Sequence, residues 1–261
     1  MLQSLKAMTG YELAALDGGI GQVREAYFDD HRWVVRHLVV DTGGWLAGRR
    51  VLISPHAIQR VNAEARALDV ALTRKQIELA PPVESDRPVS RQYEIATADF
   101  YGYPYYWGGA GLWGAMDMPL GGALGPYTGV GRGLSPDAHD SEDMRQRLDA
   151  EREAADPHLR SSAEVIGYDV AARDGAIGHI ADFLIDPASW RIALVVVDTH
   201  NWLPDRLVLV PPTLVDSVDW SSRQAVFTLS REAVKDSPPY DAAAPLGMDE
   251  AVKVQTHFER S

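Results

Sequence analysis

The sequence predicts a mainly β protein: two small antiparallel β-barrels in tandem, with short helices and a connector rich in glycine and aromatic residues. The first observation is a repeat, because residues 38–46 (LVVDTGGWL) return as residues 195–203 (VVVDTHNWL), 157 positions later. The match extends without a gap over residues 10–82 and 167–239. The second observation is that each copy holds several short strand-like segments separated by turn residues, which is typical of a small barrel. Two copies are too few for a stacked solenoid, so we expect two similar domains.

The first copy contains four predicted strands and a closing helix. The strands are residues 20–28, 33–40, 50–54 and 67–72. Gly21 interrupts the first strand and is expected at a bulge or a close backbone approach. Thr73 and Gln76 have the spacing of a capping box, which predicts a short helix that the prolines at 81 and 82 end.

The second copy repeats the same order of elements. Its predicted strands are residues 177–185, 190–197, 207–210 and 225–229, with a closing turn from Ser230. The turn before Trp190 contains an Asp-Pro pair, which is common turn chemistry and supports the alignment of the copies.

The repeat divides the chain into four predicted regions. They are a first barrel (1–83), a connector (84–160), a second barrel (161–240) and a C-terminal tail (241–261). In the connector we expect a short helix over residues 89–100 and a charged helix over residues 140–153. Between them, residues 100–133 are rich in glycine and aromatic side chains, and so much glycine disfavours regular structure.

The aromatic tract leaves two interpretations open. It either folds back over the barrels or acts as a docking arm for a protein partner or a membrane interface, because Tyr and Trp suit such boundaries. The candidate partner-binding residues are Tyr101, Tyr103, Tyr105, Tyr106, Trp107 and Trp113.

Composition and charge restrict the function classes. The chain has no cysteine, which excludes disulfides, thiolate metal sites and cysteine nucleophiles. The N-terminus lacks the apolar core of a signal peptide and no run is long enough to span a membrane, so we expect a soluble, cytoplasmic protein. The net charge of −12 comes from the connector and second copy, since residues 1–90 carry 11 basic and 11 acidic side chains. Nucleic acid is a poor partner for such a surface.

No candidate catalytic or metal-binding residue emerges from the motifs, and no cofactor is expected. Asp41 and Asp198 are interpreted as corner residues that accept backbone N–H bonds, with Trp45 and Trp202 covering the corners; a catalytic pair of carboxylates is the weaker interpretation. Trp33 and Trp190 are expected in barrel packing, and for all four tryptophans a role as interface anchors is the alternative. The histidines include no pair at metal-ligand spacing.

Three motifs present in both copies resemble the PRC-barrel domain. They are Asp-Gly-x-Ile-Gly (residues 17–21 and 174–178), an acidic turn before a Trp, and Val-Val-Asp-Thr before Trp-Leu. That domain also forms the cytoplasmic part of the photosynthetic reaction-centre H subunit and the C-terminal domain of the ribosome maturation factor RimM. The chain is most similar to bacterial tandem PRC-barrel proteins, and the resemblance covers nearly all of it except residues 114–140.

The resemblance implies an assembly or docking module. We expect a non-enzymatic protein–protein adaptor or assembly factor whose partner the sequence does not identify. The alternatives are an accessory subunit of a membrane or photosynthetic complex, associated peripherally, and a ribosome or RNA-processing assembly factor. The acidic charge disfavours direct RNA contact. Formation of a homodimer is left open.

Overall fold

The computed structural model describes residues 1–81, 91–119, 159–199, 206–219 and 221–259. Its internal contacts divide the chain into two compact units, each built from separated stretches. Unit 1 consists of Met1–Thr9, Phe28–Val35 and Arg160–Ser261, and unit 2 consists of Gly10–Tyr27 and Arg36–Leu159. The predicted regions are continuous in sequence, whereas each unit takes residues from both sides of the predicted boundaries.

The first copy forms a seven-stranded sheet with the strand order β5-β4-β3-β2-β7-β6, and β8 pairs with β3. Its strands are β2 (Glu12–Ala15), β3 (Gly18–Asp29), β4 (Val34–Asp41), β5 (Arg50–Ile53), β6 (Ile58–Asn62), β7 (Ala67–Val70) and β8 (Leu159–Ser161). The four strands predicted here are all present. The prediction missed β2, β6 and β8, which are short and have few alternating apolar residues.

The second copy forms the same sheet, with the order β12-β11-β10-β9-β14-β13 and β1 paired with β10. Its strands are β1 (Gln3–Ser4), β9 (Asp169–Ala172), β10 (Gly175–Ile185), β11 (Ile192–Asp198), β12 (Leu207–Val210), β13 (Val215–Asp219) and β14 (Gln224–Phe227). The protein is therefore mainly β, with two sheets of identical strand order. Each sheet contains one parallel pair, β2–β7 or β9–β14, which the expectation of purely antiparallel barrels did not include.

The first residues of the chain belong to the sheet of the second copy. Gln3 pairs with Ile185 and Ser4 with Leu184. The Ser4 hydroxyl donates to the carboxylate of Asp182, which also accepts the backbone N–H of Lys6 at 2.9 Å. The corresponding strand of the second copy, β8, pairs with β3. Each sheet thus takes its short extra strand from the residues that precede the other copy.

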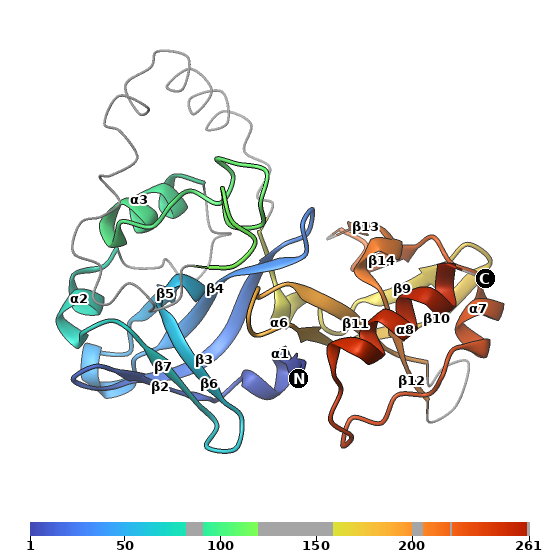
Figure 1. Cartoon of the computed structure of the whole chain (residues 1–261), viewed down its shortest axis with the longest axis horizontal. Helices are drawn as coiled ribbons and strands as arrows, with labels where there is room; N and C mark the ends of the chain where they lie inside the picture. The colour runs from blue at the N-terminus through green and yellow to red at the C-terminus, as the bar shows by residue number, and fades with distance from the viewer. Residues whose placement is uncertain (82–90, 120–158, 200–205, 220, 260–261) are drawn as a thin grey trace, which may run out of the picture. The chain divides into compact units, whose positions relative to one another are not determined.

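Short helices close and cover the sheets (Figure 1). The helices are α1 (Leu5–Met8), α2 (Arg74–Leu79), α3 (Arg91–Tyr101), α6 (Ser162–Val165), α7 (Arg231–Asp236) and α8 (Met248–Glu259), with 3-10 turns η1 (Gly43–Leu46), η2 (Pro55–Ala57) and η4 (Pro212–Leu214). The predicted capping box is confirmed, because Thr73 and Gln76 exchange side-chain and backbone bonds at the start of α2. The helix predicted over residues 140–153 lies outside the described residues. None of the described helices is long and apolar enough to cross a membrane.

An aromatic cluster forms part of the core of unit 1. The rings of Phe28, Trp33 and Phe183 lie with centroids 5.1 to 6.3 Å apart. Trp33 and Trp190 both have positive φ angles, 54° and 60°, which are uncommon for bulky residues. Their backbone geometry is held by two equivalent hydrogen bonds: the carbonyl of Trp33 accepts from Ile192 (2.7 Å), and that of Trp190 accepts from Val35 (2.9 Å). Both tryptophans are buried, as expected for packing residues.

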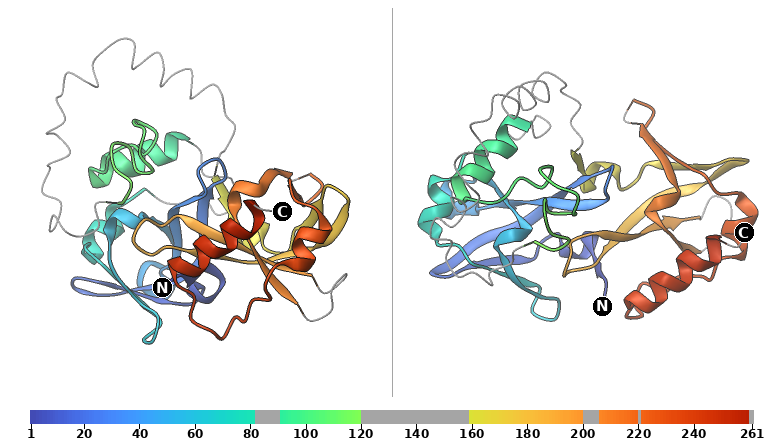
Figure 2. Two further views of the ribbon diagram at one scale, coloured as in Figure 1. Left: turned by 45° about the vertical axis from the view of Figure 1, so that its right-hand side comes forward. Right: turned by 45° about the horizontal axis from the view of Figure 1, so that its top comes forward.

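Helix α8 covers one face of the second sheet within unit 1 (Figures 1 and 2). Its Ala251 is buried in an apolar cluster, and Val254 packs against the same cluster. The sheet contributes Leu184, Leu194, Val196 and Leu209. The cluster shared by helix and sheet is therefore apolar, which is the usual solution for a helix on a sheet.

Candidate functional site

In unit 2, α3 occupies the place that α8 has in unit 1, and a further segment follows it. Tyr93 of α3 packs against Val39 of β4 and Leu52 of β5. Residues 102–118, named here the aromatic strap, continue from α3 and fold over Arg36 and His56. The strap is a third layer that the described part of unit 1 lacks.

The centre of this layer is Arg36, whose side chain is fully buried. Its guanidinium lies 3.8 Å from the centroid of the Tyr106 ring and 5.0 Å from that of Trp113, so two strap rings contact the cation. It also donates to the backbone carbonyl of Leu112. Cation–π contacts that are shielded from water are each worth about 2 kcal/mol. Arg36 therefore attaches the strap to β4.

A buried acid and a histidine lie beside this arginine. The Tyr106 hydroxyl donates to the Glu94 carboxylate at 2.8 Å, and Nε2 of His37 lies 3.5 Å from the same oxygen. Glu94 and His37 are 4% and 8% exposed at their side chains. Three layers thus meet at one carboxylate: α3 supplies Glu94, β4 supplies His37 and the strap supplies Tyr106.

His56 of η2 completes the cluster on the other side of the strap. Its ring stacks on Tyr103 with centroids 5.1 Å apart and meets the edge of Trp113 at 4.9 Å. Burial, together with the smaller electrostatic effects of His37 and Arg36, lowers the pKa of His56 from 6.5 to about 4. His56 is therefore a neutral ring at pH 7.

The glycines of the strap allow its backbone to approach itself closely. A Cβ on Gly109 would lie 2.4 Å from the carbonyl oxygen of Gly114, and one on Gly111 would lie 2.5 Å from that of Met116. The backbone of Trp113 donates to Met116 at 2.7 Å, and that of Gly111 donates to Gly114 at 2.8 Å. The glycine-rich composition here serves a compact, hydrogen-bonded turn.

The offset of 157 shows that the fold does not require this polar cluster. Arg36 and His37 correspond to Ala193 and Leu194, both of which contact the apolar cluster beneath α8. Ala193 lies at a register shift between β10 and β11, where it has no pairing partner in β10. Because of this irregularity, the adjacent residues Ala193 and Leu194 both contact the same layer. The remaining equivalences are Glu94 with Ala251, Thr97 with Val254 and His56 with Thr213. The same backbone is thus built with apolar or small side chains in the second copy.

The predicted partner-binding residues all belong to α3 or the strap, but they differ in exposure. Tyr101, Tyr106 and Trp113 are buried. Tyr103, Tyr105 and Trp107 are partly exposed. The rings of Tyr105 and Trp107 stack 5.0 Å apart at an angle of 6°, and the Tyr105 hydroxyl donates to Asp99. The described part of the tract folds back on unit 2, and of the six predicted residues Tyr103, Tyr105 and Trp107 are the ones that reach solvent.

The predicted corner residues lie at strand ends. Asp41 accepts the backbone N–H of Gly43 at 2.8 Å and the guanidinium of Arg24 at 2.8 Å, and these bonds hold its pKa below 3.8. Trp45 lies under the guanidinium of Arg74, 4.4 Å from its ring centroid. Asp198 ends β11, and its Oδ2 lies 3.9 Å from Nε2 of His179. Trp202 lies outside the described residues.

The sequence interpretation singled out none of Arg36, His37, His56 and Glu94 as a site residue. A usable signal existed. When the copies are aligned at the offset of 157, each of these charged or titratable residues is equivalent to an apolar or small residue in the second copy. Aligning the two copies position by position would have marked β4 and α3. Among the described residues, no three His, Asp or Glu side chains are grouped to hold a metal ion.

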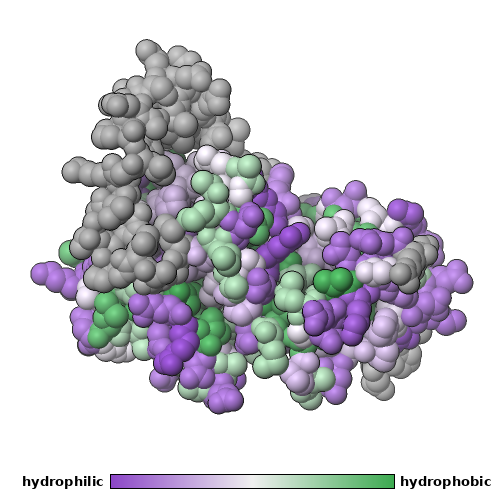
Figure 3. Space-filling view, viewed as in Figure 1, coloured by the Kyte–Doolittle hydropathy of each residue, from purple (hydrophilic) through white to green (hydrophobic). Residues whose placement is uncertain are grey.

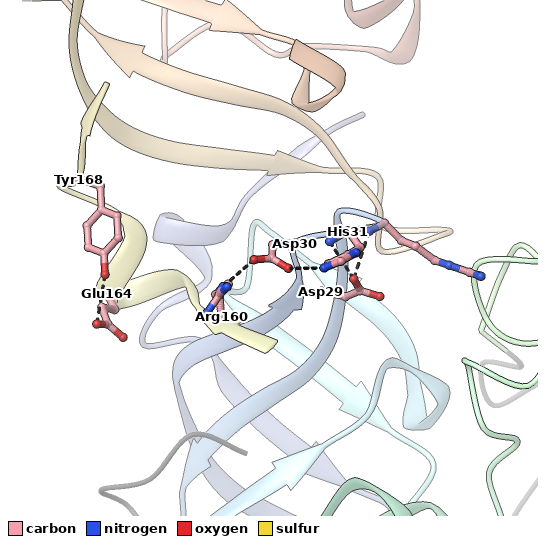
Figure 4. A network of polar contacts seen from close by, with 7 residues as sticks. Asp29, Asp30, His31, Arg160, Glu164 and Tyr168 are labelled. Atoms are coloured by element: carbon pink, nitrogen blue, oxygen red, sulfur yellow. Dashed lines mark hydrogen bonds and ion pairs between the residues drawn. The ribbon is translucent and has the colours of Figure 1, made fainter. Parts of the chain in front are cut away.

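A second polar cluster lies in unit 1 and connects β8 to the β3–β4 turn (Figure 4). The Arg160 guanidinium donates to the Asp30 carboxylate at 2.5 Å, and their side chains are 15% and 12% exposed. Asp29 accepts the backbone N–H groups of His31 and Arg32 at 3.0 and 3.1 Å, which fixes the turn. The pair occurs once, because the equivalent positions are Gln3 and Pro187.

The Arg160–Asp30 pair gives a first testable prediction. Arg160→Gln is expected to lower the free energy of unfolding by about 2 kcal/mol, because it leaves a mostly buried carboxylate without its cation. Urea denaturation of the full chain measures the change. The control is Arg60→Ala, whose partner is Asp69 and whose side chain is 68% exposed, for which a change within about 0.5 kcal/mol is expected. Equal losses for the two variants would contradict the prediction.

Comparison with known proteins identifies one region of the chain. A family model described as PRC-barrel domain matches residues 157–227, which run from β8 to β14. No curated protein matches the chain. The matched span contains the motif at residues 174–178 and the strand β11 that ends at Asp198. The chain therefore contains a PRC-barrel domain at residues 157–227.

Proposed function

We propose that this protein is a non-enzymatic adaptor or assembly factor built on two PRC barrels, and that it binds a protein partner through the exposed rim of the aromatic strap. The rim is defined as Tyr103, Tyr105, Trp107, Met116 and Met118. A PRC-barrel domain is a protein-interaction module in general, which is consistent with such a role. The family model covers the second copy, so the assignment of the first copy belongs to the proposal.

The sheet topology supports the assignment of the first copy. Its strand order is the same as that of the matched copy, position by position. The first copy also carries the Asp-Gly-x-Ile-Gly motif at residues 17–21 and the Val-Val-Asp-Thr motif at residues 39–42. Fold similarity alone does not give a function, so the function must come from a feature that the fold does not require.

The strap is that feature, and its attachment to Arg36 carries the proposal. Tyr, Trp and Met are enriched in protein interfaces. Met116 and Met118 are 41% and 58% exposed, and the rings of the rim are partly exposed. Because the buried arginine, the glutamate and the strap backbone bonds already hold the rim in one conformation, a partner would lose little conformational entropy on binding.

The described surface elsewhere is mixed in character. In the view of Figure 3, hydrophobic side chains outside the grey atoms form small separate groups among hydrophilic ones. A few aromatic or methionine anchors usually dominate the free energy of binding. A compact rim of this kind therefore suits a modest docking site that depends on a few residues.

Matched point substitutions test the rim. Met118→Asp places a charge on the strap, and Val252→Asp places the same charge on α8, where Val252 is 59% exposed. Cross-linking and affinity purification from native lysate would identify partners, which are then purified and titrated against each variant. We expect Met118→Asp and Trp107→Ala to weaken binding at least about 30-fold, the effect of losing an interface anchor of about 2 kcal/mol. Val252→Asp is expected to bind normally.

The result can also go against the proposal. If both aspartate variants retain every partner, the strap is not the docking surface. If Val252→Asp alone abolishes binding, the docking surface lies on α8. Hydrogen exchange of residues 102–118 in each variant confirms that the strap remains folded, so that lost binding reports on the rim and not on unfolding.

A further inference from the structure

We infer that the aromatic strap is an acid-sensitive cover: protonation of His56 releases residues 102–118 from the sheet and exposes the Arg36 cluster beneath them. The inference rests on the geometry of unit 2 and does not require the rim to bind a partner. Its central observation is that a titratable ring, and not an inert one, lies against two rings of the strap, one of which also contacts a buried cation.

Two rings of the strap contact His56, and the buried guanidinium of Arg36 belongs to the same cluster. His56 contacts Tyr103 and Trp113 of the strap, with ring centroids 5.1 and 4.9 Å apart. The charged and titratable groups that face it come from β4, which supplies Arg36 and His37, both buried. Trp113 contacts both His56 and Arg36, so a single strap residue connects the histidine with the arginine.

The remaining titratable groups of the cluster lie farther along the same layer. Glu94 of α3 is 3.5 Å from His37 and accepts the hydroxyl of Tyr106 at 2.8 Å. The carboxylate is thus engaged by β4 and the strap. A further positive charge on His56 would be buried in the cluster that already holds the Arg36 cation, and its stacking partners are the rings of Tyr103 and Trp113.

Opening the strap would hydrate His56 and restore its ordinary proton affinity. The pKa of His56 is about 4 beneath the strap and 6.5 when hydrated, so the open form binds protons more tightly. Both forms are neutral above pH 6.5, where closure is fully favoured. As the pH falls from 6.5 through 4, the ratio of open to closed strap is expected to rise, up to about 300-fold.

The second copy shows what the position needs for structure alone. Thr213 occupies the place of His56, and it is exposed. The helix–sheet layer beside it is apolar, with Ala193, Leu194 and Ala251. The histidine, the arginine and the covering strap occur together in one copy and are all replaced or absent in the described part of the other. This joint occurrence is expected if the histidine, the arginine and the strap act together.

Hydrogen exchange at several pH values tests the inference on the full chain, after correction for intrinsic exchange rates. We expect residues 102–118 to lose protection between pH 6.5 and 4 while β5 (Arg50–Ile53) keeps its protection. His56→Phe keeps a ring that stacks on Tyr103 but cannot titrate, so its strap should stay protected over the same range. His56→Gln serves as a second non-titrating variant if the larger ring disturbs packing.

A histidine elsewhere provides the control. His179→Gln removes a partly exposed histidine from unit 1 and should leave the pH profile of the strap unchanged. The inference is overturned if strap protection is constant from pH 7 to 4, or if both His56 variants keep the wild-type profile. It is also overturned if β5 loses protection together with the strap, because the acid transition would then be unfolding of unit 2.

Discussion

Replacing Gly21 by alanine is expected to lower the free energy of unfolding by about 4 kcal/mol. A Cβ on Gly21 would lie 2.0 Å from the carbonyl oxygen of Asp41 and 2.8 Å from Cα of Thr42, and both are backbone atoms that cannot move aside cheaply. The residue also has φ of +153°, a region that L side chains rarely adopt. Overpacking costs about 1–3 kcal/mol and a strained backbone a similar amount.

Urea denaturation compares Gly21→Ala with Gly19→Ala, a glycine of the same strand. A Cβ on Gly19 would meet nothing within 4 Å, so a small change is expected there. Gly178 is the equivalent of Gly21 in the second copy, and its Cβ would lie 1.8 Å from the carbonyl oxygen of Asp198. Gly178→Ala should therefore show a similar loss. Equal stabilities for the Gly21 and Gly19 variants would refute the close approach.

Removal of Arg36 is the second substitution with a large expected effect. Arg36→Ala should lower the free energy of unfolding by about 3 kcal/mol and remove the protection of residues 102–118 from hydrogen exchange. The physical reason is that Tyr106 and Trp113 lose the cation that they enclose, and Tyr106 also donates to the buried carboxylate of Glu94, so the cluster loses a positive charge. Alanine itself fits the backbone, because Ala193 occupies the equivalent bulged position.

The second copy supplies the test of this explanation. The double variant Arg36→Ala, Glu94→Ala introduces the residues that the second copy has at both positions, Ala193 and Ala251. If an uncompensated buried charge causes the loss, the double variant should be more stable than Arg36→Ala alone, with a coupling free energy of about 1–3 kcal/mol. Arg24→Ala, at an arginine that is 56% exposed, controls for loss of surface charge. Strictly additive losses would show that packing against the rings dominates.

Much of the fold could be predicted because the duplication and the turn residues are local signals. The motif at residues 38–46 placed β4 and its copy, and Gly21 was expected at the close approach that the structure shows. Long-range pairing has no such signal. The strands β1 and β8 are two and three residues long, and nothing in their sequence states that each pairs outside its own copy.

The candidate site was predicted in part. The aromatic residues of the strap were identified from composition, but their division into buried and exposed side chains depends on Arg36, which lies more than 60 positions away in the sequence. A single arginine in an apolar strand gives no local sequence pattern from which its enclosure by two aromatic rings could be predicted. The role of Arg36 is recognised only in the folded structure, where β4, α3 and the strap lie together. The difference between Arg36 and the equivalent Ala193 then supports that role.

The pairing of β1 with β10 has a consequence for the biosynthesis of the chain. The hydroxyl of Ser4 contacts a residue 178 positions later, so residues 3 and 4 cannot reach their place in unit 1 before Asp182 has been translated. Contacts of such sequence separation form slowly, since a long loop must close first. Domains usually fold in the order in which they leave the ribosome. Here residues 1–9 are incorporated only together with residues 160–261, so unit 1 is completed after the residues of unit 2 have been translated.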